Sequence, residues 1–177
     1  MDSVTRDLFL AQDGDNEAFT RVMQATEGDV RRFCAWQNLH RDDIDDVVQE
    51  TFLRAYRGLH TLSYGITCRS WILTIARNTC VDHFRKSGQL RRNTKAIERH
   101  VQSHQDDATT TVALEQMIFS LPEVFRDAFV LVRLMGFSYD EVAAILGCPR
   151  GTVQSRVARA RESLMLSAGN EQVSKVS

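Results

Sequence analysis

The sequence predicts an all-helical protein made of two small helical domains joined by a flexible linker. Apolar residues recur at spacings of three and four along most of the chain, and the alternating β-branched runs typical of strands are missing. Only two prolines occur in 177 residues, so helices can run long. Residues 88–107 hold much charge and few large apolar side chains, a composition typical of a linker. We therefore expect one domain at residues 1–87 and a second at 108–168.

The first domain is expected to contain three helices with different outer surfaces. A helix over 15–36 begins at a capping Asp or Asn and pauses at Gly28. A helix over about 42–56 carries an apolar stripe and, on its other side, an acidic ridge. After a loop at 60–67, a helix that begins near Arg69 and ends before Gly88 shows mainly basic side chains on its outer side.

The second domain is expected to hold shorter helices. Pro122 suits the first turn of one of them, because the N–H that proline lacks would have no partner there. The last residues, 169–177, are small and polar, and we expect a disordered tail. The helices are predicted at about 109–120, 122–135, 138–146 and 151–166.

The composition excludes several classes of protein. Hydrophobic residues make up 43% and charged residues 25%, which is ordinary for a globular chain with a sizeable core. No run of about 18 apolar residues occurs, and acidic residues are spread through the first thirty positions, so neither a membrane span nor a signal peptide is expected. We expect a cytoplasmic protein with no membrane insertion of its own.

The net charge of −1 does not by itself favour a nucleic-acid partner, but the charges lie in blocks. Residues 1–60 and 106–149 each carry five more acidic than basic side chains. Residues 61–105 carry eight basic and two acidic side chains, and residues 150–177 carry five and two. This pattern suits a protein that holds a nucleic acid in two places, although charge blocks can also be solvated helix faces.

Neither a cofactor nor a metal ion is expected. The four cysteines form no CxxC pair, so we expect reduced, buried or half-buried thiols. His100 and His104 could share a helix face, but no third ligand is close in the sequence. No nucleophile, base and orienting group cluster at a suggestive spacing, which disfavours an enzyme.

Residues 137–161 carry the most specific motif of the chain. Ser138 and Glu141 form a capping box for a short helix that Gly147 ends. After a turn, Thr152 caps or opens a second helix, which gives the sequence form of a helix-turn-helix. The alternative is a plain helical hairpin with a solvated basic helix. The side chains presented outward suit base edges and phosphates in a major groove: Gln154, Ser155, Arg156, Arg159 and Arg161.

Three segments resemble a known family. The segment SYDEVAAILGCP followed by GTVQSRVARARESL resembles the fourth conserved region of bacterial extracytoplasmic-function (ECF) sigma factors. The segment DDIDDVVQETFLRAYRGL (42–59) resembles the second region, and RSWILTIARNTCVDHFRK (69–86) resembles the helix that melts and recognises the promoter. The resemblance implies a protein that binds core RNA polymerase at its clamp coiled coil and flap, directs transcription initiation, and is not an enzyme.

The resemblance also implies roles for individual residues. In the second region, Asp46, Gln49, Glu50 and Phe52 would dock on the clamp coiled coil, although an acidic helix can also be merely solvated. Asn78 would contact an extruded base of the −10 element. Phosphate contacts near the −10 element are expected from Arg69, Arg77, His83, Arg85 and Lys86.

Two segments depart from the common family pattern. The loop after residue 60 has Leu62 and Tyr64 where many relatives carry Phe followed by Arg-Gly-Asp. In the helix after this loop, Trp71 is interpreted as a core anchor rather than a base stacker. Gln154 stands where many relatives carry Arg or Lys, which predicts a shifted −35 preference. The −35 contacts would come from Thr152, Gln154, Ser155, Arg156 and Arg159, while Arg161 could instead pair with Glu162 or with an acidic residue of the neighbouring helix.

The same resemblance implies further properties of the linker and of the partners. The linker would pass through polymerase near the RNA exit path, and an anti-sigma factor is usual in the family. Weak binding to free DNA is expected if the acidic blocks repel phosphates until polymerase covers them.

A rival function is a dimeric helix-turn-helix regulator, which leaves the second-region motif unexplained. A second rival is a small enzyme that uses His100 and His104.

Overall fold

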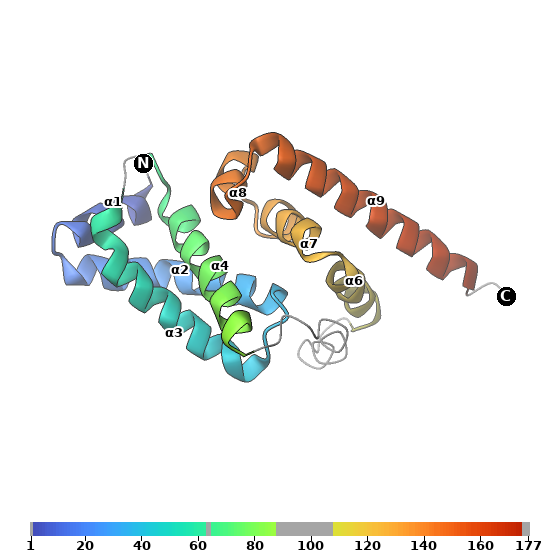
Figure 1. Ribbon diagram of the computed structural model, residues 1–177, viewed down its shortest axis with the longest axis horizontal. Helices are drawn as coiled ribbons and strands as arrows, with labels where there is room; N and C mark the ends of the chain where they lie inside the picture. The colour runs from blue at the N-terminus through green and yellow to red at the C-terminus, as the bar shows by residue number, and fades with distance from the viewer. Residues whose placement is uncertain (1, 63–64, 88–107, 175–177) are drawn as a thin grey trace. The chain divides into compact units, whose positions relative to one another are not determined.

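The computed structural model describes residues 2–62, 65–87 and 108–174, and every regular element in these ranges is helical (Figure 1). The chain divides into two compact units, which lie for the most part before and after residue 90. The predicted all-helical fold class with two helical domains is therefore confirmed. The linker at 88–107, with His100 and His104, lies outside the described residues, as does Tyr64.

The first unit is a bundle around the helix α2. It contains α1 (Ser3–Gln12), α2 (Asn16–Trp36), α3 (Arg41–Gly58), the short 3-10 helix η1 (Leu59–Thr61) and α4 (Cys68–Lys86). Helix α2 packs against α1, α3 and α4 (Figure 1). Each helix turns an apolar stripe inward, because burying apolar surface is the main favourable contribution to folding. Side chains of this core include Leu8, Val22, Phe33, Val47 and Ile72.

Helix α1 is an element that the sequence reasoning missed. Asp2 caps it by accepting the backbone N–H of Thr5 at 2.8 Å, and the buried side chains Thr5, Leu8 and Ala11 follow at a spacing of three. That spacing and the capping aspartate were the available signal. Gly14, with φ of 104°, then makes the sharp turn into α2.

The helix geometry bears on two expectations about the first unit. Asp15 caps α2 through the N–H of Ala18 at 3.0 Å, as predicted, but the helix continues through Gly28 without the expected pause. Trp71 is half-buried, and its ring lies close to Gly58, where an added Cβ would meet the ring at 3.7 Å. Trp71 thus packs against the end of α3 but is not fully buried, so its interpretation as a core anchor stays a prediction.

None of the four cysteines, all within the described residues, forms a disulfide, and three of them lie in the core of the first unit. The sulfur atoms of Cys34 on α2 and Cys80 on α4 lie 3.8 Å apart. Burial, together with the nearby Asp2 and Asp7 carboxylates, raises the pKa of the Cys68 thiol to about 12. Cys148, in the second unit, is half-exposed.

The second unit contains α6 (Ala108–Ser120), α7 (Glu123–Phe129), η3 (Val130–Leu134), α8 (Tyr139–Leu146) and α9 (Arg150–Ser174). Helix α7 packs against α9, and the buried side chains of this unit include Leu131 on η3 and Val153 and Val157 on α9. The predicted helix over 122–135 changes character part-way, since η3 is a π-helical segment in which the N–H of Met135 donates to the carbonyl of Val130.

A buried arginine joins the first two helices of this unit. Arg126 on α7 is 4% exposed, and its Nη1 donates to the carbonyl of Phe119 on α6 at 3.3 Å. Its guanidinium also lies 6.0 Å from the centroid of the Phe119 ring. Burial lowers the pKa of Arg126. The pairing partly offsets the cost of removing this cation from water.

Helix α9 is longer than the sequence predicts. We expect its end near Leu166 and disorder over 169–177, whereas the helix continues to Ser174. No proline interrupts this stretch, and the Ser167 hydroxyl donates to the carbonyl of Ser163 one turn earlier. Once a helix is nucleated by packing, each added residue gains a backbone hydrogen bond at little further cost, so polar residues can extend it.

Candidate functional site

The outer face of α3 combines acidic, amide and apolar groups. Asp46 and Gln49 are exposed and Glu50 is half-exposed, as the sequence predicts for a docking surface. Phe52, in contrast, is 5% exposed and belongs to the inward stripe, which argues against a direct contact with polymerase. The exposed apolar side chains of this helix are Leu53 and Tyr56, with exposed fractions of 51% and 50%.

The sequence already contained the signal for this burial. Phe52 lies four residues after Val48 and three before Ala55, which are both buried, and this spacing places the three side chains on one side of the helix. Leu53 and Tyr56 are three residues apart and outside that stripe. Apolar groups beside carboxylates are typical of a surface that binds a protein partner.

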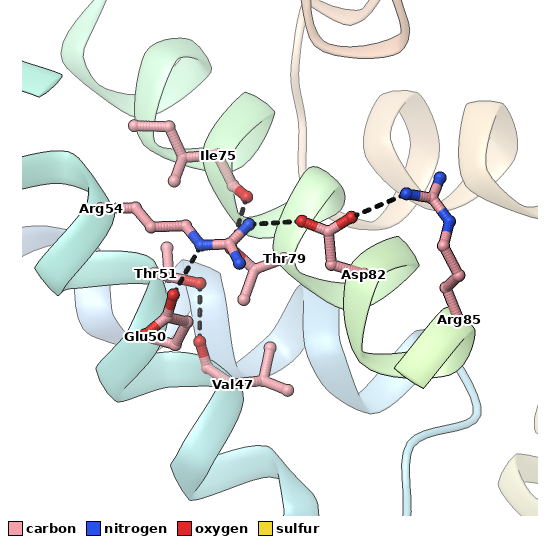
Figure 2. Close-up of polar contacts among 8 residues, drawn as sticks. All are labelled: Val47, Glu50, Thr51, Arg54, Ile75, Thr79, Asp82 and Arg85. Carbon is pink, nitrogen blue, oxygen red and sulfur yellow. Dashed lines mark hydrogen bonds and ion pairs between the residues drawn. The ribbon is translucent and has the colours of Figure 1, made fainter. Parts of the chain in front are cut away.

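An arginine that the sequence reasoning missed links α3 to α4. Arg54 donates from Nε to Glu50 Oε1 and from Nη1 to Asp82 Oδ2, both at 2.7 Å. Asp82 Oδ1 in turn lies 3.4 Å from Arg85 Nη1. Figure 2 shows this chain of alternating charges running from α3 to α4. The hydrogen bond to Arg54 is the main reason that the pKa values of Glu50 and Asp82 lie below their ordinary range.

Helix α4 carries the basic residues predicted to contact DNA. Asn78, Arg85 and Lys86 are exposed, whereas Arg77 and His83 are half-buried. His83 Nε2 lies 3.4 Å from Asp43 Oδ2 on α3. The structure thus places these residues on one helix, but not all of them are equally accessible to a ligand.

Arg69 lies in the first turn of α4 and is exposed. Its Nε donates to Asp29 Oδ2 on α2 at 2.7 Å, so part of its charge is already balanced within the unit. A phosphate contact from Arg69 would compete with Asp29. We therefore expect Arg69 to contribute less to DNA binding than Arg85 or Lys86.

The helix-turn-helix motif forms as the sequence predicts. The Ser138 N–H donates to Glu141 Oε2 at 2.9 Å, and the Glu141 N–H donates to the Ser138 hydroxyl at 3.3 Å, which completes the capping box of α8. Gly147 ends α8 with φ of 62°, a conformation in which a side chain would be strained. Arg150 then pairs with Asp140 at 3.1 Å across the turn.

The outward side of α9 presents the predicted recognition residues. Gln154, Ser155 and Arg159 are exposed. Arg156 is half-buried, and its Nη1 lies 3.7 Å from the sulfur of Cys148. Thr152 does not cap the helix, because α9 begins two residues earlier and the Thr152 N–H donates to the carbonyl of Pro149. The exposed amide and guanidinium groups suit major-groove readout.

Both units match known families. Residues 22–89 match Sigma-70 region 2, and residues 111–164 match Sigma-70 region 4. The chain is also 36% identical over 175 residues to the ECF RNA polymerase sigma factor SigC of Mycobacterium tuberculosis, which covers 94% of this chain and 92% of SigC. The chain belongs to the ECF sigma factors. This sigma factor therefore binds core RNA polymerase, directs it to promoter DNA and is not an enzyme.

Solved structures agree with this assignment. A sigma factor RpoE, in a complex with the anti-sigma factor NepR from Bartonella quintana, has a TM-score of 0.69 and 28% identity and covers 82% of this chain and 93% of its own. CnrH, in a complex with the cytosolic domain of CnrY, has a TM-score of 0.74 and 24% identity, covers 96% of this chain and 99% of its own, and shares the fold.

Two features are absent from the described residues. In residues 2–62, 65–87 and 108–174, no group of three or more His, Cys, Asp or Glu residues is placed to hold a metal ion. Within the same ranges, no helix is both long and apolar enough to cross a membrane.

Proposed function

We propose that the two units of this sigma factor divide promoter recognition between them. Residues 1–87 act as region 2, which binds polymerase and recognises and melts the −10 element, and residues 108–168 act as region 4, which reads the −35 element. The single observation that carries this proposal is that one unit holds an acidic helix and a basic helix side by side, while the other holds a capped helix-turn-helix. Residues 88–107 connect the two.

The polymerase contact is proposed on the outer face of α3. Asp46, Gln49 and Glu50 supply carboxylates and an amide for a basic groove in the clamp coiled coil, and charge complementarity speeds assembly and fixes its register. Leu53 and Tyr56 take the place of Phe52, because they are the exposed apolar groups of this helix. An apolar contact between charged contacts excludes water from the interface.

The −10 contact is proposed on α4. Asn78 would hold an extruded base through its amide, and Arg85 and Lys86 would follow the phosphates. Arg77, His83 and Arg69 are the remaining proposed contacts, with the internal pairing of Arg69 and the half-burial of the other two reducing their share. Melting would then be driven by the binding of single-stranded bases, without any chemical step.

The −35 contact is proposed on α9. Gln154 suits adenine, and Arg156 and Arg159 suit guanine or phosphates, each good pair with a base being worth about 1–3 kcal/mol of discrimination. Ser155 and Thr152 complete the proposed set, with the Ser155 hydroxyl at present donating to the Thr152 carbonyl at 2.9 Å. Contacts between this unit and the flap of polymerase would hold the unit over the −35 element.

We further propose that this protein works in the cytoplasm, where core polymerase is found, and is held inactive by an anti-sigma factor. The support for the second point is its likeness to RpoE, whose structure was solved with the anti-sigma factor NepR. An anti-sigma factor that covered α3 would block polymerase docking by occupying the same exposed Leu53 and Tyr56 side chains.

The test is transcription in vitro with core RNA polymerase and a library of genomic fragments. We expect starts downstream of a shared −35 and −10 pair, which would reveal both elements at once. The variant Asp46→Lys should lose most of this activity, whereas Glu17→Lys, the same charge reversal on the exposed surface of α2, should keep it. Transcription that does not depend on the added protein would contradict the proposal.

The rival function, a dimeric regulator that recruits nothing, predicts a different result. Such a protein would protect an operator from nuclease without polymerase. We expect weak binding to free duplex DNA, because 12 acidic side chains among residues 1–60 repel phosphates. A gel shift with tight, sequence-specific binding by the protein alone would favour the rival.

A further inference from the structure

We propose that Arg54 is a positioning residue that couples polymerase binding on α3 to DNA binding on α4; this inference rests on the function proposed above. Arg54 touches neither proposed partner itself. It acts through Glu50, which belongs to the proposed polymerase contact, and through Asp82, which neighbours the proposed DNA contact Arg85.

The geometry gives one cation two competing carboxylates on different helices. Arg54 Nε contacts Glu50 Oε1 and Arg54 Nη1 contacts Asp82 Oδ2, each at 2.7 Å (Figure 2). Asp82 uses its other oxygen, Oδ1, for Arg85 Nη1 at 3.4 Å. The Arg54 side chain is 30% exposed, whereas that of Arg85 is 73% exposed. Arg85, at one end of this series of charges, is therefore open to a ligand, while Arg54 is held between the two helices.

Charge balance explains how binding at one end changes the other. When a cation of polymerase binds Glu50, that carboxylate attracts Arg54 less, and Arg54 interacts more strongly with Asp82. Asp82 then holds Arg85 less strongly, which leaves the Arg85 guanidinium available for a DNA phosphate. By linkage, the phosphate must strengthen polymerase binding by the same factor.

Arg31 provides a matched control within the same unit. It contacts Glu27 on its own helix, four residues away, and Asp45 on α3, so it joins α2 to α3 as Arg54 joins α3 to α4. Neither Glu27 nor Asp45 belongs to a proposed contact with polymerase or DNA. Loss of Arg31 thus removes a bridge of the same design without touching the proposed coupling.

The experiment measures the affinity of the full-length, fluorescently labelled protein for core RNA polymerase, with and without a promoter fragment. The fragment comes from the transcription experiment above and carries a single-stranded −10 region. The coupling is the dissociation constant measured without the fragment divided by the one measured with it. We expect Arg54→Met to lower this ratio roughly three- to tenfold, as fits exposed ion pairs and typical couplings. Arg31→Met should leave the ratio unchanged.

A second variant separates coupling from folding. Arg54→Lys keeps the charge but lacks the fork that contacts two carboxylates together, so it should melt close to the wild-type temperature and still lose the coupling. Equal ratios in the wild type and Arg54→Met, or equal losses in Arg54→Met and Arg31→Met, would overturn the inference. If the wild type itself failed to bind core polymerase, that result would contradict the proposed function and would be distinct from a loss of coupling in Arg54→Met.

Discussion

Arginines that bridge neighbouring helices are the recurring residue-scale feature of the first unit. Arg21 joins α2 to Asp7 on α1, Arg31 joins α2 to Asp45 on α3, and Arg54 joins α3 to Asp82 on α4. All of these pairs are partly exposed, so solvent screens them and each stabilises the fold only slightly. Their value lies in fixing how the helices meet, because a guanidinium fork prescribes both distance and direction.

Thr5 makes a bond that should matter more for stability. Its hydroxyl accepts the buried N–H of Cys68, in the first turn of α4, at 3.0 Å. The change Thr5→Val would leave that N–H without a partner and should lower the free energy of unfolding by about 1–3 kcal/mol. Urea unfolding followed by tryptophan fluorescence would measure this loss.

Thr26→Val is the matched control for that experiment. Thr26 is also buried, but its hydroxyl donates to the Val22 carbonyl within its own helix, so the change leaves no buried N–H without a hydrogen-bond partner. We expect an effect well below that of Thr5→Val. Equal losses for the two variants would show that the bond between α1 and α4 contributes nothing special.

Gln154 offers a test of base readout at the residue scale. The variant Gln154→Arg should move the preference at one −35 position from adenine toward guanine, since a guanidinium pairs with guanine O6 and N7. Transcription from promoters substituted base by base would measure the shift. Glu162→Arg adds the same group farther along the exposed side of α9 and should leave the preference unchanged. Identical base profiles for wild type and Gln154→Arg would refute the assignment.

At the scale of elements, helix ends are determined by short polar motifs. Ser138 and Glu141 satisfy each other's backbone N–H groups at the start of α8. Ser138→Ala should destabilise the second unit by about 1 kcal/mol. Thermal unfolding followed by circular dichroism would measure this, and Ser120→Ala, at the end of α6, is the control, since that hydroxyl only adds a bond to the Met117 carbonyl. Comparable losses for both serines would argue against the capping role.

Sequence patterns predict helices better than the contacts between them. The apolar spacing predicts α2, α3 and α4 to within a few residues, and the capping box and Gly147 predict the helix-turn-helix. The π-helical segment η3 was not predictable, because a shift from one backbone acceptor to the next leaves no mark in composition. The bridge made by Arg54 was equally hidden, since Glu50 is four residues away but Asp82 meets it only after α3 and α4 pack.

At the scale of the whole molecule, both tryptophans, Trp36 and Trp71, lie in the first unit. Tryptophan fluorescence therefore reports the unfolding of that unit, whereas circular dichroism reports both. Several carboxylates of the first unit, those of Asp2, Asp7, Glu50 and Asp82, have pKa values below their ordinary range because of hydrogen bonds to Thr5, Arg21 and Arg54.

These lowered pKa values predict how the first unit responds to acid. The unfolded chain takes up protons at higher pH than the folded chain, so the stabilisation is complete above roughly pH 5 and is lost as the pH falls below about 4. Urea unfolding between pH 7 and pH 3, followed by tryptophan fluorescence, would measure the decline. A midpoint that did not change over this range would contradict the importance of these bonds.

The unequal burial of the thiols gives this protein a natural chemical label. Cys34, Cys68 and Cys80 are closed off inside the first unit, while Cys148 is half-exposed in the turn before α9 and contacts Arg156. An alkylating reagent should thus react with one site per molecule, beside the helix that is proposed to read the −35 element. Promoter DNA that covered Arg156 would shield this sulfur, so the rate of alkylation would report occupancy of the −35 element without an added dye.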